Sequence, residues 1–220
     1  MTKFVVGLDL GQAQDYTALA VVERTEGGER HVRHLERFPL GTTYPAIVER
    51  VAALLSREPL AGDAELVVDA TGVGAPVVDL LRDAGLRPVA VTITGGEKVI
   101  RGSDGWRVPK RDLVAALQVA LQTGRLKVAA TLPLAEILTR ELLDFRVRIT
   151  DAAHDTYGAW REGSHDDLVL AVALAVWWAE NIPQPPAIAV VEDRDPAAHL
   201  GRRIRRVEHW QFPTPGIERT

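Results

Sequence analysis

KFVVGLDLG, residues 3–11, is the stretch that decides the fold. Its nearly continuous apolar and β-branched residues are typical of a central strand that is covered on both faces. The run ends on a carboxylate, Asp9, just before Gly11. AELVVDAT, residues 64–71, has the same character and closes on Asp69. Two buried strands that each end on an aspartate indicate an acidic site where these strands finish.

The elements around these two strands predict the order of the sheet. Residues 17–24 and 30–38 read as strands that form an antiparallel meander with the first quoted stretch. A short helix and a strand at residues 88–94 follow the second quoted stretch, which predicts a right-handed βαβ unit. The result is a mixed α/β sheet of five strands in the order 3-2-1-4-5 with helices on both faces, which is the ribonuclease-H-like order. The expected helices are residues 44–58, 74–85, 109–123, near 131–144 and 165–181.

Composition narrows the function classes. The 220-residue chain has no cysteine, which excludes disulfides, thiolate nucleophiles and zinc ribbons. Its net charge of −4 argues against a wholly basic nucleic-acid-binding protein but allows a local basic face. We expect one domain over residues 1–182 and an extended or disordered Pro/Arg-rich tail over residues 183–220. No secretion signal is evident, and the longest apolar run is too short to span a bilayer, so a cytoplasmic protein without membrane contact is expected.

The two strand-end aspartates are expected to be neighbours. In the order 3-2-1-4-5, the first and fourth strands are adjacent and parallel, so Asp9 and Asp69 lie side by side. Like charges repel at short range and burial removes their hydration, and both effects raise their pKa values and cost stability. A divalent cation removes this conflict, because Mg²⁺ and Mn²⁺ prefer carboxylate oxygens. A single aspartate after a strand is usually a turn residue, so the prediction depends on the pair.

A third carboxylate comes from SHDD, residues 164–167, at the start of the apolar helix. Ser164 and Asp167 have capping-box spacing, which leaves Asp166 as the freer acid and makes Asp167 either a cap or the ligand of a second metal. Asp166 alone would be a helix-start charge favoured by the dipole. His165 is an exposed first-turn residue or a group that orients water or phosphate. The predicted catalytic acids are Asp9, Asp69 and Asp166, and the predicted metal ligands are Asp9, Asp69, Asp166 and Asp167.

Other residues are candidates for supporting roles. Asp15 is either a loop residue or a group beside the first metal. The turn at residues 71–74 is either a plain βα turn or a set of amides that approach a phosphate. Trp106 is expected to pin the polar loop at residues 95–108 to the body of the protein. A duplex needs positive charge around an acidic pocket, although a solvated surface is the alternative for each cation. The predicted DNA-binding residues are Lys98, Arg101, Arg107, Lys110 and Arg111.

Four stretches of the sequence carry a family resemblance. They are GLDLGQAQDYTALAVVE (7–23), VVDATGVGAPVVDLL (67–81), VPKRDLVAALQVALQTGRLKV (108–128) and SHDDLVLAVALA (164–175). Together they resemble the nuclease domain of the large terminase subunit of tailed bacteriophages, from about residue 3 to 181. The first stretch is shared with sugar kinases and Holliday-junction resolvases, whereas DATGVG and HDDLVLAVALA at this spacing are more distinctive.

The resemblance implies an endonuclease that cuts concatemeric double-stranded DNA during genome packaging in the host bacterial cytoplasm. The family's acids match Asp9, Asp69 and the Asp166–Asp167 pair, with Asp15 in the position of an auxiliary acid. Two Mg²⁺ or Mn²⁺ ions roughly 3.5–4 Å apart would activate a water and stabilise the leaving 3′ oxygen, with Asp9 as the bridging ligand. The sequence contains no G-x-x-x-x-G-K-[ST]. Besides double-stranded DNA, the candidate partners are therefore a separate packaging ATPase, a small terminase or a portal protein.

Three alternatives stay open at this point. A resolvase-like nuclease would prefer branched DNA, such as a four-way junction. A single-domain actin-like or sugar-kinase-type protein would bind a nucleotide, as the GLDLG motif allows. A catalytically inactive packaging adaptor would keep the fold alone, but three crowded carboxylates without a metal would then destabilise the protein to no purpose.

Overall fold

The computed structural model describes residues 2–11, 15–149, 155–159 and 166–181. The predicted Pro/Arg-rich tail, residues 183–220, lies outside these ranges, as do Ser164 and His165. None of the helices in the described ranges combines the length and apolar character needed to cross a bilayer.

A mixed eight-stranded sheet forms the centre of the fold, in the order β6-β7-β5-β4-β1-β2-β3-β8. The predicted order 3-2-1-4-5 is confirmed as its inner part. β8 extends the sheet beside β3, and β7 lies parallel to β5 at the other end, where the β6–β7 hairpin closes the polar loop. The strands are β1 Phe4–Asp9, β2 Ala18–Arg24, β3 Arg30–Arg37, β4 Ala64–Asp69, β5 Val89–Thr94, β6 Ile100–Arg101, β7 Trp106–Pro109 and β8 Leu126–Val128.

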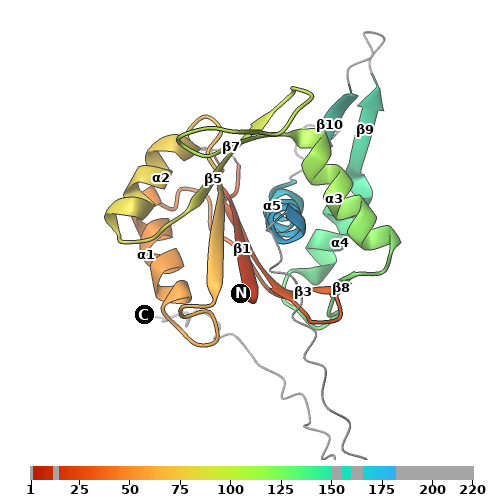
Figure 1. Ribbon diagram of the computed structural model, residues 1–220. Helices are drawn as coiled ribbons and strands as arrows, with labels where there is room; N and C mark the ends of the chain where they lie inside the picture. The colour runs from red at the N-terminus through yellow and green to blue at the C-terminus, as the bar shows by residue number, and fades with distance from the viewer. Residues whose placement is uncertain (1, 12–14, 150–154, 160–165, 182–220) are drawn as a thin grey trace, which may run out of the picture. The chain divides into compact units, whose positions relative to one another are not determined.

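Helices cover both faces of this sheet, as expected (Figure 1). α1 and α2 lie on one face, while α5 lies on the other, against β1 and β2. α3 and α4 pack on α5, and β9 and β10 form a separate two-stranded sheet. These elements are α1 Tyr44–Leu55, α2 Gly74–Asp83, α3 Lys110–Gln122, α4 Ala135–Asp144, α5 Asp167–Asn181, β9 Phe145–Ile149 and β10 Asp155–Ala159.

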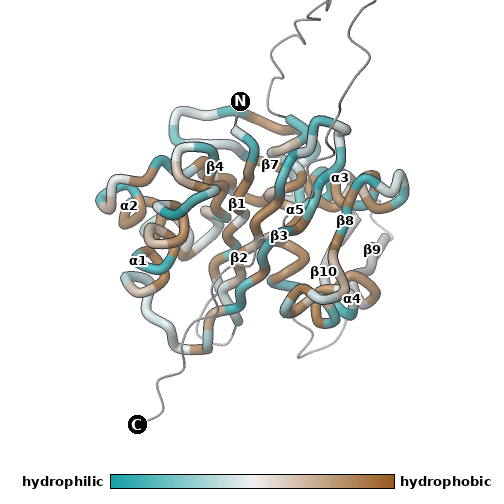
Figure 2. Tube along the Cα trace, turned by 90° about the horizontal axis from the view of Figure 1, so that it is seen from below, coloured by the Kyte–Doolittle hydropathy of each residue, from teal (hydrophilic) through white to brown (hydrophobic). Residues whose placement is uncertain are grey.

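The apolar helix α5 is sandwiched in the core. It is apolar nearly all round its circumference, because it contacts the sheet on one side and α3 and α4 on the other. Figure 2 shows that the strands β1 and β2 beneath it are also largely hydrophobic. The expected burial of this helix is confirmed.

A glycine allows α5 to lie unusually close to β1. A Cβ atom added at Gly7 would lie 2.0 Å from the carbonyl oxygen of Ala171 and 3.1 Å from the amide nitrogen of Ala175. No other residue leaves room for this contact. Gly7 is two residues before the end of β1, and Ala171 is one turn after the start of α5. The contact therefore brings the first turn of α5 to the end of β1.

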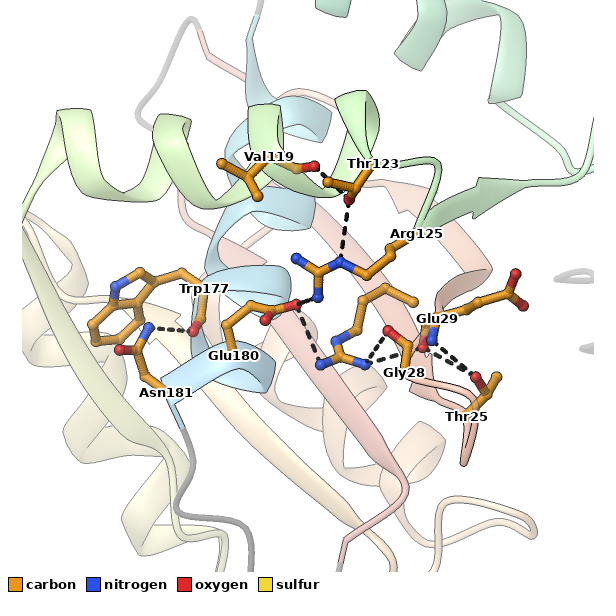
Figure 3. A network of polar contacts seen from close by, with 10 residues as sticks. Thr25, Gly28, Glu29, Val119, Thr123, Arg125, Trp177, Glu180 and Asn181 are labelled. Atoms are coloured by element: carbon orange, nitrogen blue, oxygen red, sulfur yellow. Dashed lines mark hydrogen bonds and ion pairs between the residues drawn. The ribbon is translucent and has the colours of Figure 1, made fainter.

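The last turn of α5 is held by charged side chains (Figure 3). Glu180 accepts a hydrogen bond from Arg125, just before β8, at 2.8 Å and pairs with Arg30, at the start of β3, at 3.2 Å. Arg30 also donates to the carbonyl oxygens of Gly28 and Glu29. The helix is thus tied to the β3–β8 side of the sheet at the end far from Asp9.

We expect Gly7→Ala to destabilise the protein by about 1–3 kcal/mol, because overpacking forces the helix and the strand apart. Urea denaturation followed by circular dichroism measures this change. Gly27→Ala is the matched control, because its Cβ would have only Thr25 Oγ1 nearby, at 3.8 Å. Its free energy of unfolding should stay within about 0.5 kcal/mol of the wild-type value. Equal effects of the two substitutions would contradict the role of the contact.

Candidate active site

Asp9 and Asp69 end two adjacent parallel strands. The last register pair between β1 and β4 is Leu8 with Val68, so the two aspartates are the next residues along their strands. Asp9 is buried, and Asp69 is half-buried. The structure thus brings the two acids together as the strand order predicts.

Asp166 and Asp167 stand at the start of α5. The carbonyl oxygen of Asp166 accepts the first helical hydrogen bond, from the amide of Leu170 at 2.9 Å, so Asp166 is the N-cap residue. Asp167 is therefore the first residue of the helix. The predicted capping box requires Asp167 to be the third, so that prediction was wrong. Its side chain is buried.

The four carboxylates interact electrostatically. Burial raises the pKa of Asp9 well above its ordinary value, and the charges of Asp69, Asp167 and Asp166 raise it further. Burial also raises the pKa of Asp69, against the opposing effects of hydrogen bonds from Thr71 and the charge of Lys110. The other three acids are therefore close enough to Asp9 to destabilise its charged form, as anticipated for a site that takes a cation.

Lys110 lies among these acids. Its Nζ is 3.4 Å from Oδ2 of Asp166. Its positive charge also opposes part of the rise in the pKa values of Asp9 and Asp69. The lysine begins α3 directly after Pro109, which ends β7 beside β5. The sequence marked Lys110 only as a phosphate contact, whereas the structure also places its charge inside the acidic cluster.

A buried network that the sequence did not reveal supports the first turn of α5. Glu141 in α4 accepts hydrogen bonds from the amides of Leu168 at 3.0 Å and Val169 at 3.2 Å, so it caps the helix from outside. Arg37 at the end of β3 pairs with Glu141, and its Nη2 is also 3.2 Å from Oδ2 of Asp167. Burial raises the pKa of Glu141 to about 7, because the loss of hydration outweighs the charge of Arg37 and the amide bonds. No local motif signals this role.

Asp15 is not among the charges that shift the pKa of Asp9. It is exposed and lines a cleft of about 220 Å³ together with Gly11, Thr17 and Tyr44. The candidate auxiliary acid is therefore near the end of β1, on the side of the loop that precedes α1. The other auxiliary candidate, His165, lies outside the described residues.

The remaining predicted cations surround the β6–β7 hairpin. Lys98, Arg101 and Arg107 are exposed, and Arg111 donates a hydrogen bond to the carbonyl oxygen of Glu97 at 2.8 Å. The guanidinium of Arg101 lies 5.4 Å from the centre of the Trp106 ring.

Trp106 fastens the hairpin to the core. Its ring packs edge-on against Trp177 and Trp178 of α5, with centroids 6.0 and 5.8 Å apart. The expectation that this tryptophan pins the loop is confirmed.

A groove lies beside the β6–β7 hairpin. It has a volume of about 610 Å³ and lies between α2 and the β6–β7 hairpin. Ala70, the residue after Asp69, is at its wall, together with Thr92, Arg82 and Arg107. The groove therefore borders the residue that follows Asp69 in the sequence, and its lining carries both the positive charge of Arg107 and the carboxylates of Asp79 and Asp104.

The donor set suits a hard divalent cation. Within the described part of the chain, no group of three or more His, Asp or Glu side chains forms a ready-made metal site. Asp9, Asp69, Asp166 and Asp167 nevertheless supply carboxylate oxygens from three elements, and their mutual repulsion is the kind that Mg²⁺ or Mn²⁺ relieves. The residues present therefore fit such an ion by charge and ligand chemistry.

Comparison with known proteins agrees with this arrangement. The family model described as the terminase RNaseH-like domain matches residues 6–177. The magnesium-bound large terminase nuclease of thermophilic phage G20c is 27% identical, with a TM-score of 0.61 and 79% of each chain covered. The nuclease domain of Thermus phage P74-26 is 26% identical, with a TM-score of 0.57 over 78% of this chain and 77% of that one.

A more distant structure shares the fold. The manganese-bound large terminase nuclease domain of bacteriophage SPP1 is 11% identical, with a TM-score of 0.54 over 82% of this chain and 87% of that one. No curated protein sequence matches the chain. Because the family model matches most of the sequence and the sheet order is that of a ribonuclease-H-like fold, this chain belongs to the terminase RNase H-like nuclease domain family.

Proposed function

We propose that this protein is a metal-dependent endonuclease that cuts double-stranded DNA during viral genome packaging. The observation that carries the proposal is the buried Asp9, whose pKa is raised by burial and by three further aspartates at the ends of β4 and α5. Family membership and the magnesium-bound G20c relative support it.

In this proposal Asp9, Asp69 and Asp166 would hold the metal, and Asp167 would be a further ligand. Bound Mg²⁺ or Mn²⁺ would supply an activated water and neutralise the charge that develops on the leaving oxygen. Lys110 adds positive charge beside Asp166, and its ammonium is near enough to the acids to contact the phosphate that is cut.

The hairpin side of the site would bind the duplex. The proposed phosphate contacts are the exposed Lys98, Arg101 and Arg107, with Arg111 at the start of α3. In this proposal a DNA strand follows the groove beside the hairpin, which Ala70 and Arg107 line. These cations offer no pattern suited to reading base edges, so we expect little sequence preference. A packaging ATPase, a small terminase or a portal protein would bring the DNA to this site.

We expect the purified protein to nick and linearise supercoiled plasmid with Mn²⁺ or Mg²⁺ and to leave it intact with EDTA. Agarose gels of the three reactions measure this. Cleavage that persists in EDTA would refute the metal-dependent mechanism. A strong preference for four-way junctions over linear duplex would favour a resolvase-like enzyme instead.

Asp9→Asn and Asp69→Asn should each reduce plasmid cleavage to background while the protein stays folded, because each removes a metal ligand and a repelling charge. Added Mn²⁺ should raise the melting temperature of the wild type but not that of Asp9→Asn, since only a ligand that binds the folded state stabilises it. Differential scanning fluorimetry in both buffers checks this.

The pH dependence of stability gives the control for these variants. The raised pKa of Asp9 means that the folded state binds this proton more tightly than the unfolded chain does. That stabilisation is complete below the ordinary pKa, about 4, and is lost as the pH rises through the raised value. In EDTA at pH 8, Asp9→Asn should therefore melt at a higher temperature than the wild type, and the difference should shrink towards pH 4. A variant that is unfolded at pH 8 would show that the acid is structural.

Substitutions of Asp166 and Asp167 should differ in their effect on the free energy of unfolding. Asp167→Asn should cost about 1–3 kcal/mol, because Arg37 loses one of its two buried partners. Asp166→Asn weakens only the partly exposed ion pair with Lys110 and should change stability by no more than about 0.5 kcal/mol while cleavage is lost. Urea denaturation and plasmid cleavage of both variants decide. An active Asp166→Asn together with an inactive, fully stable Asp167→Asn would reverse the two assignments.

A further inference from the structure

A threonine in the turn after β4 contacts Asp69 directly. Thr71 donates its backbone N–H, at 2.8 Å, and its hydroxyl to the same carboxylate oxygen, Oδ1. Its Oγ1 also accepts a hydrogen bond from the backbone N–H of Ile93 in β5, at 2.9 Å. Thr71 thus connects the carboxylate of Asp69 to the neighbouring strand.

The direction of these hydrogen bonds is fixed by chemistry. The amide of Ile93 can only donate, so it occupies a lone pair on Oγ1 of Thr71. An ionised carboxylate can only accept, so the hydroxyl proton of Thr71 points to Asp69. The threonine therefore holds Oδ1 with two donors, and a cation would bind Asp69 through its other oxygen, Oδ2.

The backbone of the turn preserves this geometry. The amide of Ala70 donates to the carbonyl oxygen of Val91 in β5 at 2.8 Å, which anchors the residue between Asp69 and Thr71. Gly72 has a φ of +57°. A Cβ at Gly74 would lie 2.1 Å from the carbonyl oxygen of Asp69. The backbone of the DATGVG motif therefore turns back closely on Asp69. The amide of Thr71 donates to the carboxylate of Asp69 and so is not available to an incoming phosphate.

We propose that Thr71 is a positioning residue for metal binding: it holds Oδ1 of Asp69 so that Oδ2 is presented to the cation shared with Asp9. The inference rests on the proposed function, because it assigns Thr71 a role only if Asp69 is a metal ligand. Residues that orient a ligand through such hydrogen bonds affect metal affinity without touching the metal.

The test compares three variants with the wild type. Thr71→Val keeps the shape of the side chain but removes the hydroxyl, Thr71→Ser restores it, and Thr71→Ala removes the bulk as well. Mn²⁺ binding to the full chain is measured by electron paramagnetic resonance titration. Thr71→Val and Thr71→Ala should bind Mn²⁺ about 10- to 100-fold more weakly, and Thr71→Ser should stay close to the wild type. Plasmid cleavage at saturating Mn²⁺ should recover more in these variants than in Asp69→Asn, which lacks the ligand itself.

A matched threonine controls for the loss of any hydroxyl. Thr123 donates its hydroxyl to the carbonyl oxygen of Val119 at 2.7 Å, at the far end of α3. Thr123→Val should leave Mn²⁺ affinity unchanged. Circular dichroism establishes that each variant is folded at the titration temperature, and Thr71→Ala replaces Thr71→Val if the valine variant is not.

The possible results separate this inference from the proposed function. Wild-type Mn²⁺ affinity in a folded Thr71→Val or Thr71→Ala would overturn the positioning role while the nuclease assignment stands. Weak binding that Thr71→Ser does not restore would also overturn it, because the hydroxyl would then not be the group responsible. A wild type that neither binds Mn²⁺ nor cuts plasmid would refute the proposed function, and the role of Thr71 with it.

Discussion

The contact between Gly7 and α5 is the constraint on which the rest of the site depends. Because the backbone of Ala171 occupies the space of a side chain at Gly7, the helix lies directly on β1. Its first turn then reaches the end of that strand, where Asp9 stands two residues after the glycine. Asp166 and Asp167, about 160 residues away along the chain, come within electrostatic range of Asp9 for this reason.

Bringing these acids together destabilises the charged protein, and several interactions offset that cost. Lys110 contributes positive charge beside Asp166, and Arg37 lies between Asp167 and Glu141. Glu141 caps the first turn of α5, while Arg125 and Arg30 hold Glu180 in its last turn (Figure 3). These contacts hold both ends of the helix. The repulsion of Asp9 by the neighbouring aspartates is what a divalent cation would relieve.

Local patterns in the sequence were enough for the inner sheet and for two of the acids. A buried strand needs several consecutive apolar residues, so β1 and β4 and the aspartates that end them were recognisable. The pairing of β8 with β3 was not, because β8 has three residues, and so short a strand forms only when a neighbouring strand pairs with it. The capping box failed because α5 begins at Asp167, and Glu141, from a different helix, binds the amides of Leu168 and Val169 in its first turn.

The sequence by itself determined the meander, the βαβ unit and the burial of α5, since these follow from the spacing of apolar residues and the length of connections. The ribonuclease-H-like order that these elements match then placed Asp9 and Asp69 at the ends of adjacent parallel strands. Only the tertiary structure decided the polar partners of the site. Lys110 meets Asp166, and Arg37 meets Glu141 and Asp167, across distances of more than 50 residues in the chain. The positions of charged residues in the sequence show no periodicity that would reveal their partners. An ion pair forms only when the two groups lie within a few ångströms of each other, and the packing of α3, α4 and α5 sets that separation.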